Sequence, residues 1–330
     1  MKYKITEISS PFMSWTDSYP VYDEDLVENY LTVENSVNRS EIRALFEVEK
    51  IHGHQDKPHI VSCSLFWKPP NLEDESYPNP TRKILQNTAE LDYSSETSPW
   101  ERYVNPFLQQ IPRLIEKFPT VSFRIYLAND LEFLVVDLVK VGCEVFLMKQ
   151  SSIASSPGAL WRFLALEEEK LVTVTNISRL NLLPTDIGRT IHIDRLGLGA
   201  WKVPVWKDFN DNQEVAYFPF SRCHSGWKGG WPIKELLESF TWNSKRGAVP
   251  TDASVATCAP LPITKTRWPD RGFDEWFLAA AMYPRVAQDG ILNFVPNTAS
   301  SVMLTLDVEY STWANSQSEI IYFQEGGGCC

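Results

Sequence analysis

Val121-Ser122-Phe123-Arg124-Ile125-Tyr126-Leu127-Ala128-Asn129-Asp130 is the stretch from which the fold of this 330-residue chain can be worked out. Its first seven residues are mostly β-branched, aromatic or aliphatic, which predicts a buried strand. The preceding segment, 106–118, has apolar residues at helical spacing. A helix over about 131–141 and a strand over 143–148 follow. This alternation indicates βαβ units and a mostly parallel sheet.

The same alternation extends in both directions along the chain. Residues 59–67 predict another buried strand, and a helix over 159–168 leads to a strand over 170–175. The second half is rich in Trp, Pro and Gly, with helices expected only over 232–240 and 274–283 and β-rich sequence over 301–324. We therefore expect an α/β fold, a mixed and mostly parallel sheet flanked by helices, with aromatic loops and a small additional β region.

We expect three regions along the chain. They are an acidic N-terminal extension (1–55), a main α/β domain (56–300), and a C-terminal β segment with a flexible tail (301–330).

The net charge, the cysteines and the apolar runs exclude some classes of function and location. Subtracting 42 Asp and Glu from 31 Lys and Arg gives a net charge of −11, which argues against a general nucleic-acid binder. A nucleic-acid partner stays a disfavoured alternative because of one basic strip (Lys245, Arg246, Lys265, Arg267, Arg271). The N-terminus has no apolar signal core, no apolar run is long enough for a membrane, and the six cysteines form no CxxC pair. We expect a cytoplasmic protein (the host cytoplasm if it is viral) with no membrane partner.

A ligand crevice in an open α/β sheet lies beyond the carboxyl ends of its strands. Two such ends are 126–130 and 175–179, and we expect the cleft between them.

Two further motifs could carry chemistry. The run Gly226-Trp227-Lys228-Gly229-Gly230-Trp231 could approach a ligand through its glycines, bind phosphate through its lysine and stack on a ring, or it could be a packed turn. Asp274-Glu275 opens a predicted helix, as an N-terminal cap or as a general base.

Four runs in order carry a family resemblance: Pro157-Gly158-Ala159-Leu160-Trp161-Arg162-Phe163-Leu164-Ala165-Leu166, Thr173-Val174-Thr175-Asn176-Ile177-Ser178-Arg179-Leu180, Gly226-Trp227-Lys228-Gly229-Gly230, and Asp274-Glu275-Trp276-Phe277-Leu278. Together they resemble nucleotide-sugar glycosyltransferases of the GT-A type, and most closely a bacterial and phage group. The resemblance covers about residues 120–295 and implies a GT-A-like, Rossmann-like sheet and sugar transfer from a nucleotide-sugar donor.

The resemblance also implies roles for individual residues. The donor nucleotide would bind at Tyr126, Ala128, Asp130, Arg162, Thr175, Asn176, Ser178 and Arg179, with Arg162 and Arg179 near the diphosphate. The sugar and acceptor would meet Gly226, Trp227, Lys228, Gly229, Gly230 and Trp231. Asp274 or Glu275 would be the catalytic base.

The chain departs from the family at its metal motif. Thr175 and Ile177 stand where the family has two metal-binding aspartates. We therefore expect no metal site and no required cofactor, because Mg²⁺ or Mn²⁺ would need those carboxylates. Arg162, Arg179 and Lys228 could neutralise the diphosphate instead, although Arg162 could also pair on the surface with Glu167 or Glu168. Two alternatives stay open: a non-catalytic binding module on the same fold, and a phage-type enzyme that glycosylates modified DNA bases.

Overall fold

The computed structural model describes the residue ranges that build the sheet and its covering helices. They are 13–16, 19–22, 43–67, 81–86, 98–151, 158–202, 205–209, 214–218, 225–245, 274, 277, 278, 282, 286, 289–298, 301–307 and 321–324.

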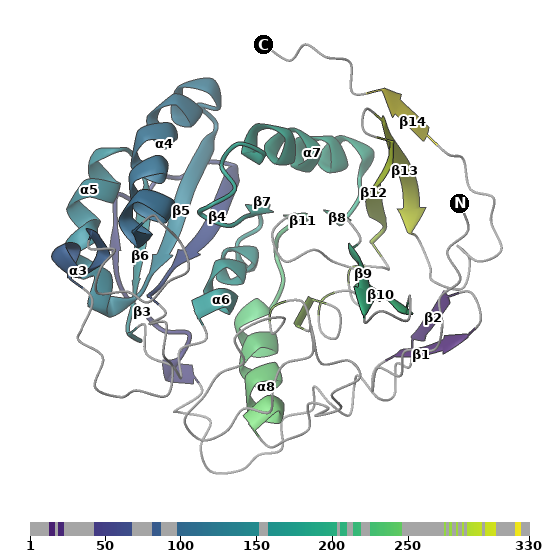
Figure 1. Ribbon diagram of the computed structural model, residues 1–330, viewed down its shortest axis with the longest axis horizontal. Helices are drawn as coiled ribbons and strands as arrows, with labels where there is room; N and C mark the ends of the chain where they lie inside the picture. The colour runs from purple at the N-terminus through teal and green to yellow at the C-terminus, as the bar shows by residue number, and fades with distance from the viewer. Residues whose placement is uncertain are drawn as a thin grey trace.

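Ten strands form one mixed sheet in the order β14-β13-β12-β8-β11-β7-β4-β5-β6-β3 (Figure 1). They are β3 (Val48–His52), β4 (His59–Leu65), β5 (Val121–Leu127), β6 (Glu144–Met148), β7 (Leu171–Val174), β8 (Ala200–Lys202), β11 (Ser225–Lys228), β12 (Ile291–Thr298), β13 (Ser301–Asp307) and β14 (Ile321–Gln324). Two antiparallel pairs stand apart: β1 (Met13–Thr16) with β2 (Tyr19–Tyr22), and β9 (Val205–Phe209) with β10 (Glu214–Phe218).

The helices lie between the strands along the chain. The α-helices are α3 (Arg82–Gln86), α4 (Asn105–Lys117), α5 (Val135–Lys140), α6 (Gly158–Trp161), α7 (Leu183–Leu196) and α8 (Ile233–Lys245). A π-helical turn (η1, Trp100–Val104) and two 3-10 segments (η2, Asn129–Leu134; η3, Arg162–Glu167) complete the described set.

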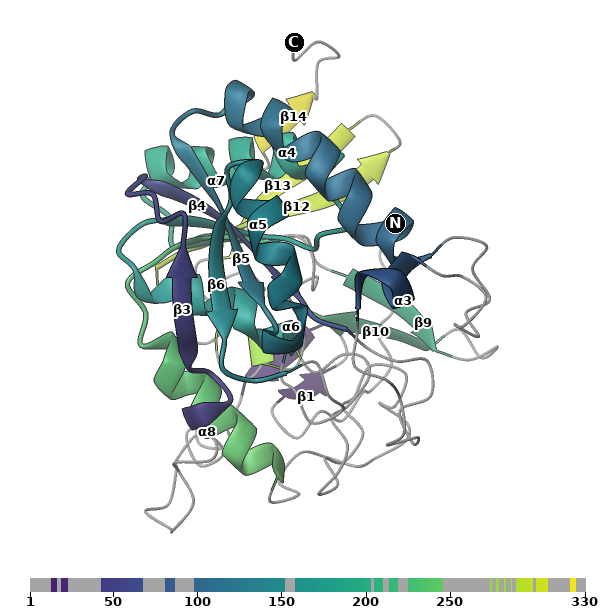
Figure 2. The same cartoon turned by 90° about the vertical axis from the view of Figure 1, so that its left-hand side faces the viewer.

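Four parallel strands, β7-β4-β5-β6, form the centre of the sheet. All seven residues of β5 are buried, and six of seven in β4, as expected of a strand covered on both faces. Helix α4 packs on β5 and α5 packs on β6, while α6 and η3 pack on β4 (Figure 2). The predicted alternation of strands and helices is confirmed here.

Strands from both ends of the chain complete this sheet. The edge strand β3 comes from the N-terminal region and pairs with β6 in antiparallel orientation. On the other side β11 runs antiparallel between β7 and β8, and β12 runs parallel to β8. The β-rich sequence over 301–324 supplies β13 and β14 to the same sheet.

The sequence prediction is wrong or incomplete at several elements, among them the helix over 159–168, helix α7 and the run around Gly226. The helix expected over 159–168 is a short α6 continued by η3. Helix α7 was not expected: its buried face includes the polar Asp186 and Thr190, which weaken the apolar period. The predicted turn at Gly226 is instead strand β11. A Cβ on Gly226 would lie 2.0 Å from Trp201 Nε1 and 2.1 Å from Thr190 Oγ1, so glycine permits close packing here.

A buried chain of polar side chains ties α7 to the sheet. His59 Nε2 lies 2.8 Å from Thr173 Oγ1, which lies 2.7 Å from Thr190 Oγ1, and Trp201 Nε1 donates to Thr190 at 2.8 Å. Burial lowers the pKa of His59 to about 4, so the ring is neutral at pH 7.

Replacing Gly226 with alanine should destabilise the protein by about 1–3 kcal/mol, because the added methyl group has no room between Trp201 and Thr190. Gly188→Ala in α7 is the matched control. A Cβ there meets nothing within 4 Å, and it should stabilise the helix by about 0.5–1 kcal/mol. Urea unfolding of both variants measures the difference. An unchanged free energy of unfolding for Gly226→Ala would contradict the packing described.

Acid should weaken the fold through His59. The unfolded state takes up its proton below about pH 6.5, whereas the folded pKa is about 4, so stability falls as the pH falls between these values. Between pH 7 and pH 5 the wild type should lose about 2 kcal/mol more than His59→Gln, whose amide does not titrate. Denaturant unfolding at the two pH values measures this. Equal pH dependence of the two proteins would show that His59 does not carry the effect.

Candidate functional site

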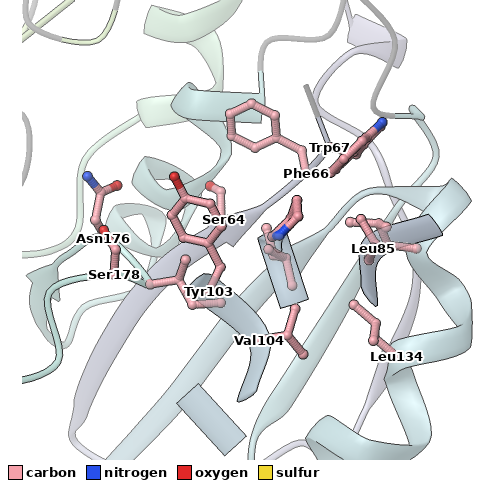
Figure 3. Close-up of a pocket in the computed structure, with 13 residues that line it drawn as sticks. Ser64, Phe66, Trp67, Leu85, Tyr103, Val104, Leu134, Asn176 and Ser178 are labelled. Atoms are coloured by element: carbon pink, nitrogen blue, oxygen red, sulfur yellow. The ribbon is translucent and has the colours of Figure 1, made fainter. Parts of the chain in front are cut away.

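A cavity of about 300 Å³ opens at the carboxyl edge of the parallel strands (Figure 3). Ser64 and Leu65 end β4 there, and residues 176–178 leave β7 beside them. The backbone sets this place, because Thr175 N still donates to Ser62 O of β4 at 3.0 Å. The lining residues are Ser64, Leu65, Phe66, Trp67, Leu85, Pro99, Tyr103, Val104, Leu131, Leu134, Asn176, Ile177 and Ser178.

The lining has two chemically different sides. Figure 3 shows Ser64, Tyr103 and Asn176 on one side and Trp67 and Leu85 on the other. The Oγ atom of Ser64 is buried, and no described residue hydrogen-bonds to it. Such an arrangement suits a flat, mostly apolar ligand with hydrogen-bonding groups along one edge.

Behind the polar side lies a buried ion pair. Arg162 is 3% exposed and Asp274 is 6% exposed, and Arg162 Nη2 donates to Asp274 Oδ2. The other terminal nitrogen, Nη1, donates to Asn176 Oδ1 at 2.6 Å. Since a buried charge is costly unless paired, Asp274 is the group that permits a guanidinium here.

The surface pairing considered for Arg162 is wrong. Glu167 Oε1 accepts a hydrogen bond from the backbone nitrogen of Lys234 instead. Glu168 pairs with Arg124 and Lys170.

The residues expected to bind the donor divide into two groups. Asn176 and Ser178 line the cavity, as does Ile177 between them. Tyr126, Ala128 and Thr175 are buried and are not among the lining residues. Burial raises the pKa of Tyr126 well above that of free tyrosine, and its ring packs against Phe146.

Beyond Ala128, the side chains that line the cavity are not the one that was predicted. Asp130 lies in the 3-10 segment η2, and its neighbours Leu131 and Leu134 supply the lining. Arg179 is exposed, next to Ser178 but outside the lining.

The structure does not bring the glycine and tryptophan run to this cavity. Gly226 and Trp227 are buried in β11, where Trp227 pairs with Val172 and Lys228 with Leu171 at the start of β7. Gly229 N donates to Lys170 O, and the nitrogens of Gly230 and Trp231 donate to Leu166 O. Lys228 to Trp231 therefore lie beside the amino end of β7, at the edge of the sheet opposite the cavity.

The candidate base and metal positions are placed only in part. Asp274 contacts Arg162 and is not among the lining residues, and Glu275 lies outside the described residues, as do the basic positions 246, 265, 267 and 271. Of the two positions where the resemblance led us to expect metal-binding aspartates, Thr175 is buried and Ile177 lines the cavity. Across the described ranges no cluster of three His, Cys, Asp or Glu side chains could hold a metal ion.

A second buried arginine provides a comparison. Arg124 on β5 is 1% exposed, and it donates from Nε to Glu144 Oε2 at 3.0 Å and from Nη1 to Glu168. Its guanidinium lies 4.2 Å from the Phe146 ring centre. Neither carboxylate lines the cavity.

Sequence reasoning missed Ser64, Phe66, Trp67 and Tyr103. Ser62 and Ser64 alternate along an otherwise apolar strand, which places both hydroxyls on one face at its carboxyl end. Phe66-Trp67 follows at once. The position of Tyr103 had no such signal, because it depends on how η1 packs.

No model of a known protein family matches the chain, and no curated protein matches it. No helix in the described part of the chain is long and apolar enough to cross a membrane.

Removing the carboxylate of Asp274 should leave a buried, unpaired guanidinium. Asp274→Ala should therefore lower the free energy of unfolding by about 3–5 kcal/mol. Glu238→Ala is the control: it breaks the pair with Arg43, whose side chain is 57% exposed, and should have a much smaller effect. Thermal and urea unfolding measure both variants. Equal losses would contradict a buried pair.

Proposed function

We propose that the protein is a GT-A-like glycosyltransferase that binds the nucleoside part of a nucleotide-sugar donor in the cavity beside Asn176, without a metal held at positions 175 and 177. The single observation that carries the proposal is this cavity, at the carboxyl edge of a sheet with a particular strand order. The family resemblance of the sequence adds to it.

The strand order supports the GT-A assignment. The seven strands of this sheet from β6 to β12 can be numbered 1 to 7 in chain order, so that β4 is strand 1 and β12 is strand 7. Across the sheet, starting at β6, they lie in the order 3-2-1-4-6-5-7. The sixth, β11, is antiparallel to both neighbours. A GT-A sheet has the same order with the same strand reversed, and its metal motif follows the fourth strand, here β7.

The cavity supports a nucleoside as ligand. A nucleobase has an apolar face that can pack on an aromatic or aliphatic side chain, and an edge of hydrogen-bond donors and acceptors. Phe66, Trp67 and Leu85 suit the face, while Ser64, Tyr103 and Asn176 suit the edge or the ribose hydroxyls.

In the transfer, the bond between the sugar's anomeric carbon and the diphosphate oxygen breaks, and the bonding electrons leave with the diphosphate. An acceptor hydroxyl forms the new bond and loses its proton to a base. Asp274 and Glu275 were the two candidates for that base. Because Asp274 contacts Arg162, Glu275 is the one that remains. Cationic side chains such as Arg179 would stabilise the leaving diphosphate in place of Mg²⁺.

A non-catalytic binding module is the second candidate. Ile177 favours it, because an apolar side chain lines the cavity where the family carries a metal ligand. Such a module would bind the nucleotide without transferring or hydrolysing the sugar.

Calorimetry with a panel of uridine, cytidine, thymidine, adenosine and guanosine diphosphate sugars, in EDTA, tests the proposal. At least one donor should bind, and slow hydrolysis should release its nucleoside diphosphate. Ser64→Ala should weaken that binding about fivefold, the value of one neutral hydrogen bond. Ser122→Ala is the control, since its buried hydroxyl also has no described partner but lies outside the lining.

Failure of every donor to bind would overturn the proposal. Binding without hydrolysis or transfer would leave the binding module, and turnover only after addition of Mg²⁺ or Mn²⁺ would overturn the metal-free site.

A further inference from the structure

The wall of the cavity that Phe66 forms is packed directly against helix α6. Phe66 lines the cavity, and Figure 3 shows its ring extending away from Trp67, on the side where Ser64 and Tyr103 lie. Gly158, the first residue of α6, is buried and is not among the lining residues. The Phe66 ring therefore lies between the backbone of α6 and the cavity.

Glycine is needed at position 158 because of this ring. A Cβ there would lie 2.5 Å from Cδ1 and Cγ of Phe66 and 2.9 Å from Cδ2, whereas an ordinary contact is 3.4–4 Å. Because the three ring atoms are at similar distances, the methyl group would stand over the face of the ring. Gly158 is not among the described glycines with a positive φ, so space rather than backbone conformation requires glycine.

Two hydrogen bonds hold α6 and η3 in place beside this ring. Trp161 is fully buried at the end of α6, and its Nε1 donates to Leu45 O at 2.8 Å. Ser62 Oγ on β4 donates to Arg162 O at 2.6 Å. The Trp161 ring also lies edge-on to the Phe66 ring, with centres 6.2 Å apart and planes at 76°. A methyl group added at position 158 should therefore displace the Phe66 ring rather than the helix.

The displaced ring would move towards the cavity, because α6 lies on its other side. To restore a contact of 3.4 Å with the new methyl group, the ring must move by about 1 Å. The cavity of about 300 Å³ has room for this movement. The fold should therefore tolerate the change, whereas the space for a ligand becomes narrower.

We propose that Gly158 is a positioning residue for ligand binding, which acts through Phe66. Because it has no side chain, the Phe66 ring lies close to α6, and the cavity stays wide enough for a nucleoside. The identity of this ligand rests on the proposed function. The role of Gly158 is steric, and it requires no particular hydrogen bond between the ligand and the lining.

Gly158→Ala should weaken nucleoside binding about tenfold, since one methyl group of excess volume at a binding pocket has an effect of this order. The probes are uridine, cytidine, adenosine and guanosine with their 5′-diphosphates, measured by calorimetry. A nucleoside and its diphosphate should lose affinity by the same factor, because the wall contacts the part that they share. Urea unfolding without ligand should show little change in the free energy of unfolding.

Two second-site variants test whether the effect passes through the ring. Phe66→Leu removes the ring that the methyl group displaces, so Gly158→Ala should cause no further loss of affinity in that background. Leu85→Ala removes volume from the other side of the cavity and should restore part of the affinity of Gly158→Ala. If Phe66→Leu alone no longer binds any probe, the Leu85→Ala pair decides.

Gly226→Ala is the matched control. It adds the same methyl group at another crowded glycine, 2.0 Å from Trp201 Nε1, in a strand that does not line the cavity. It should destabilise the protein and leave nucleoside affinity unchanged, which is the opposite of the result expected for Gly158→Ala.

Four results would overturn the positioning role while leaving the proposed function intact. They are unchanged affinity in Gly158→Ala, a large loss of its unfolding free energy, failure of both second-site variants to relieve the loss of affinity, and an equal loss in Gly226→Ala. Absence of binding by the wild type to every probe would instead overturn the proposed function, and the positioning role with it.

Discussion

The buried guanidinium of Arg162 is the charge on which the arrangement around the cavity depends. A cation excluded from water requires a partner in the folded state, and the partner here comes from 112 residues away. The position of Asp274 is therefore fixed against Arg162. Phe277 reinforces this contact, because its ring lies 5.5 Å from the ring of Phe163, the neighbour of Arg162. One ion pair thus joins the second half of the chain to the site formed by the first.

The two buried arginines divide stability and site geometry between them. Arg124 connects β5 to Glu144 at the start of β6 and to Glu168 before β7, so it fixes strands near their amino ends. Arg162 lies at the carboxyl end and contacts a residue that lines the cavity. The two arginines are alike in burial and in pairing with carboxylates, but only Arg162 contacts a residue of the cavity wall.

The sequence predicted the elements whose physics is local. Strands β4 and β5 and helix α4 have clear apolar periods, and their positions were predicted closely. The cavity lies at the expected edge because parallel strands end together. Gly226 was misjudged, since glycine in a strand and glycine in a turn look alike until the neighbour is known. The contact of Arg162 with Asp274 could not be predicted, because nothing local in either segment specifies a partner so distant in sequence.

The place of Ile177 follows from the backbone rather than from its side chain. Thr175 N bonds to β4, and Arg179 N bonds back to Asn176 O at 3.0 Å, so the segment turns at the same point whatever side chains it carries. The fold can therefore keep this edge of the cavity while the side chains at positions 175 and 177 vary. An isoleucine there contributes apolar lining, and its neighbours Asn176 and Ser178 contribute the polar groups of this segment. Because Asn176 is held by Arg162, the cavity wall has an ordered hydrogen-bonding side chain although neither position 175 nor position 177 carries a carboxylate.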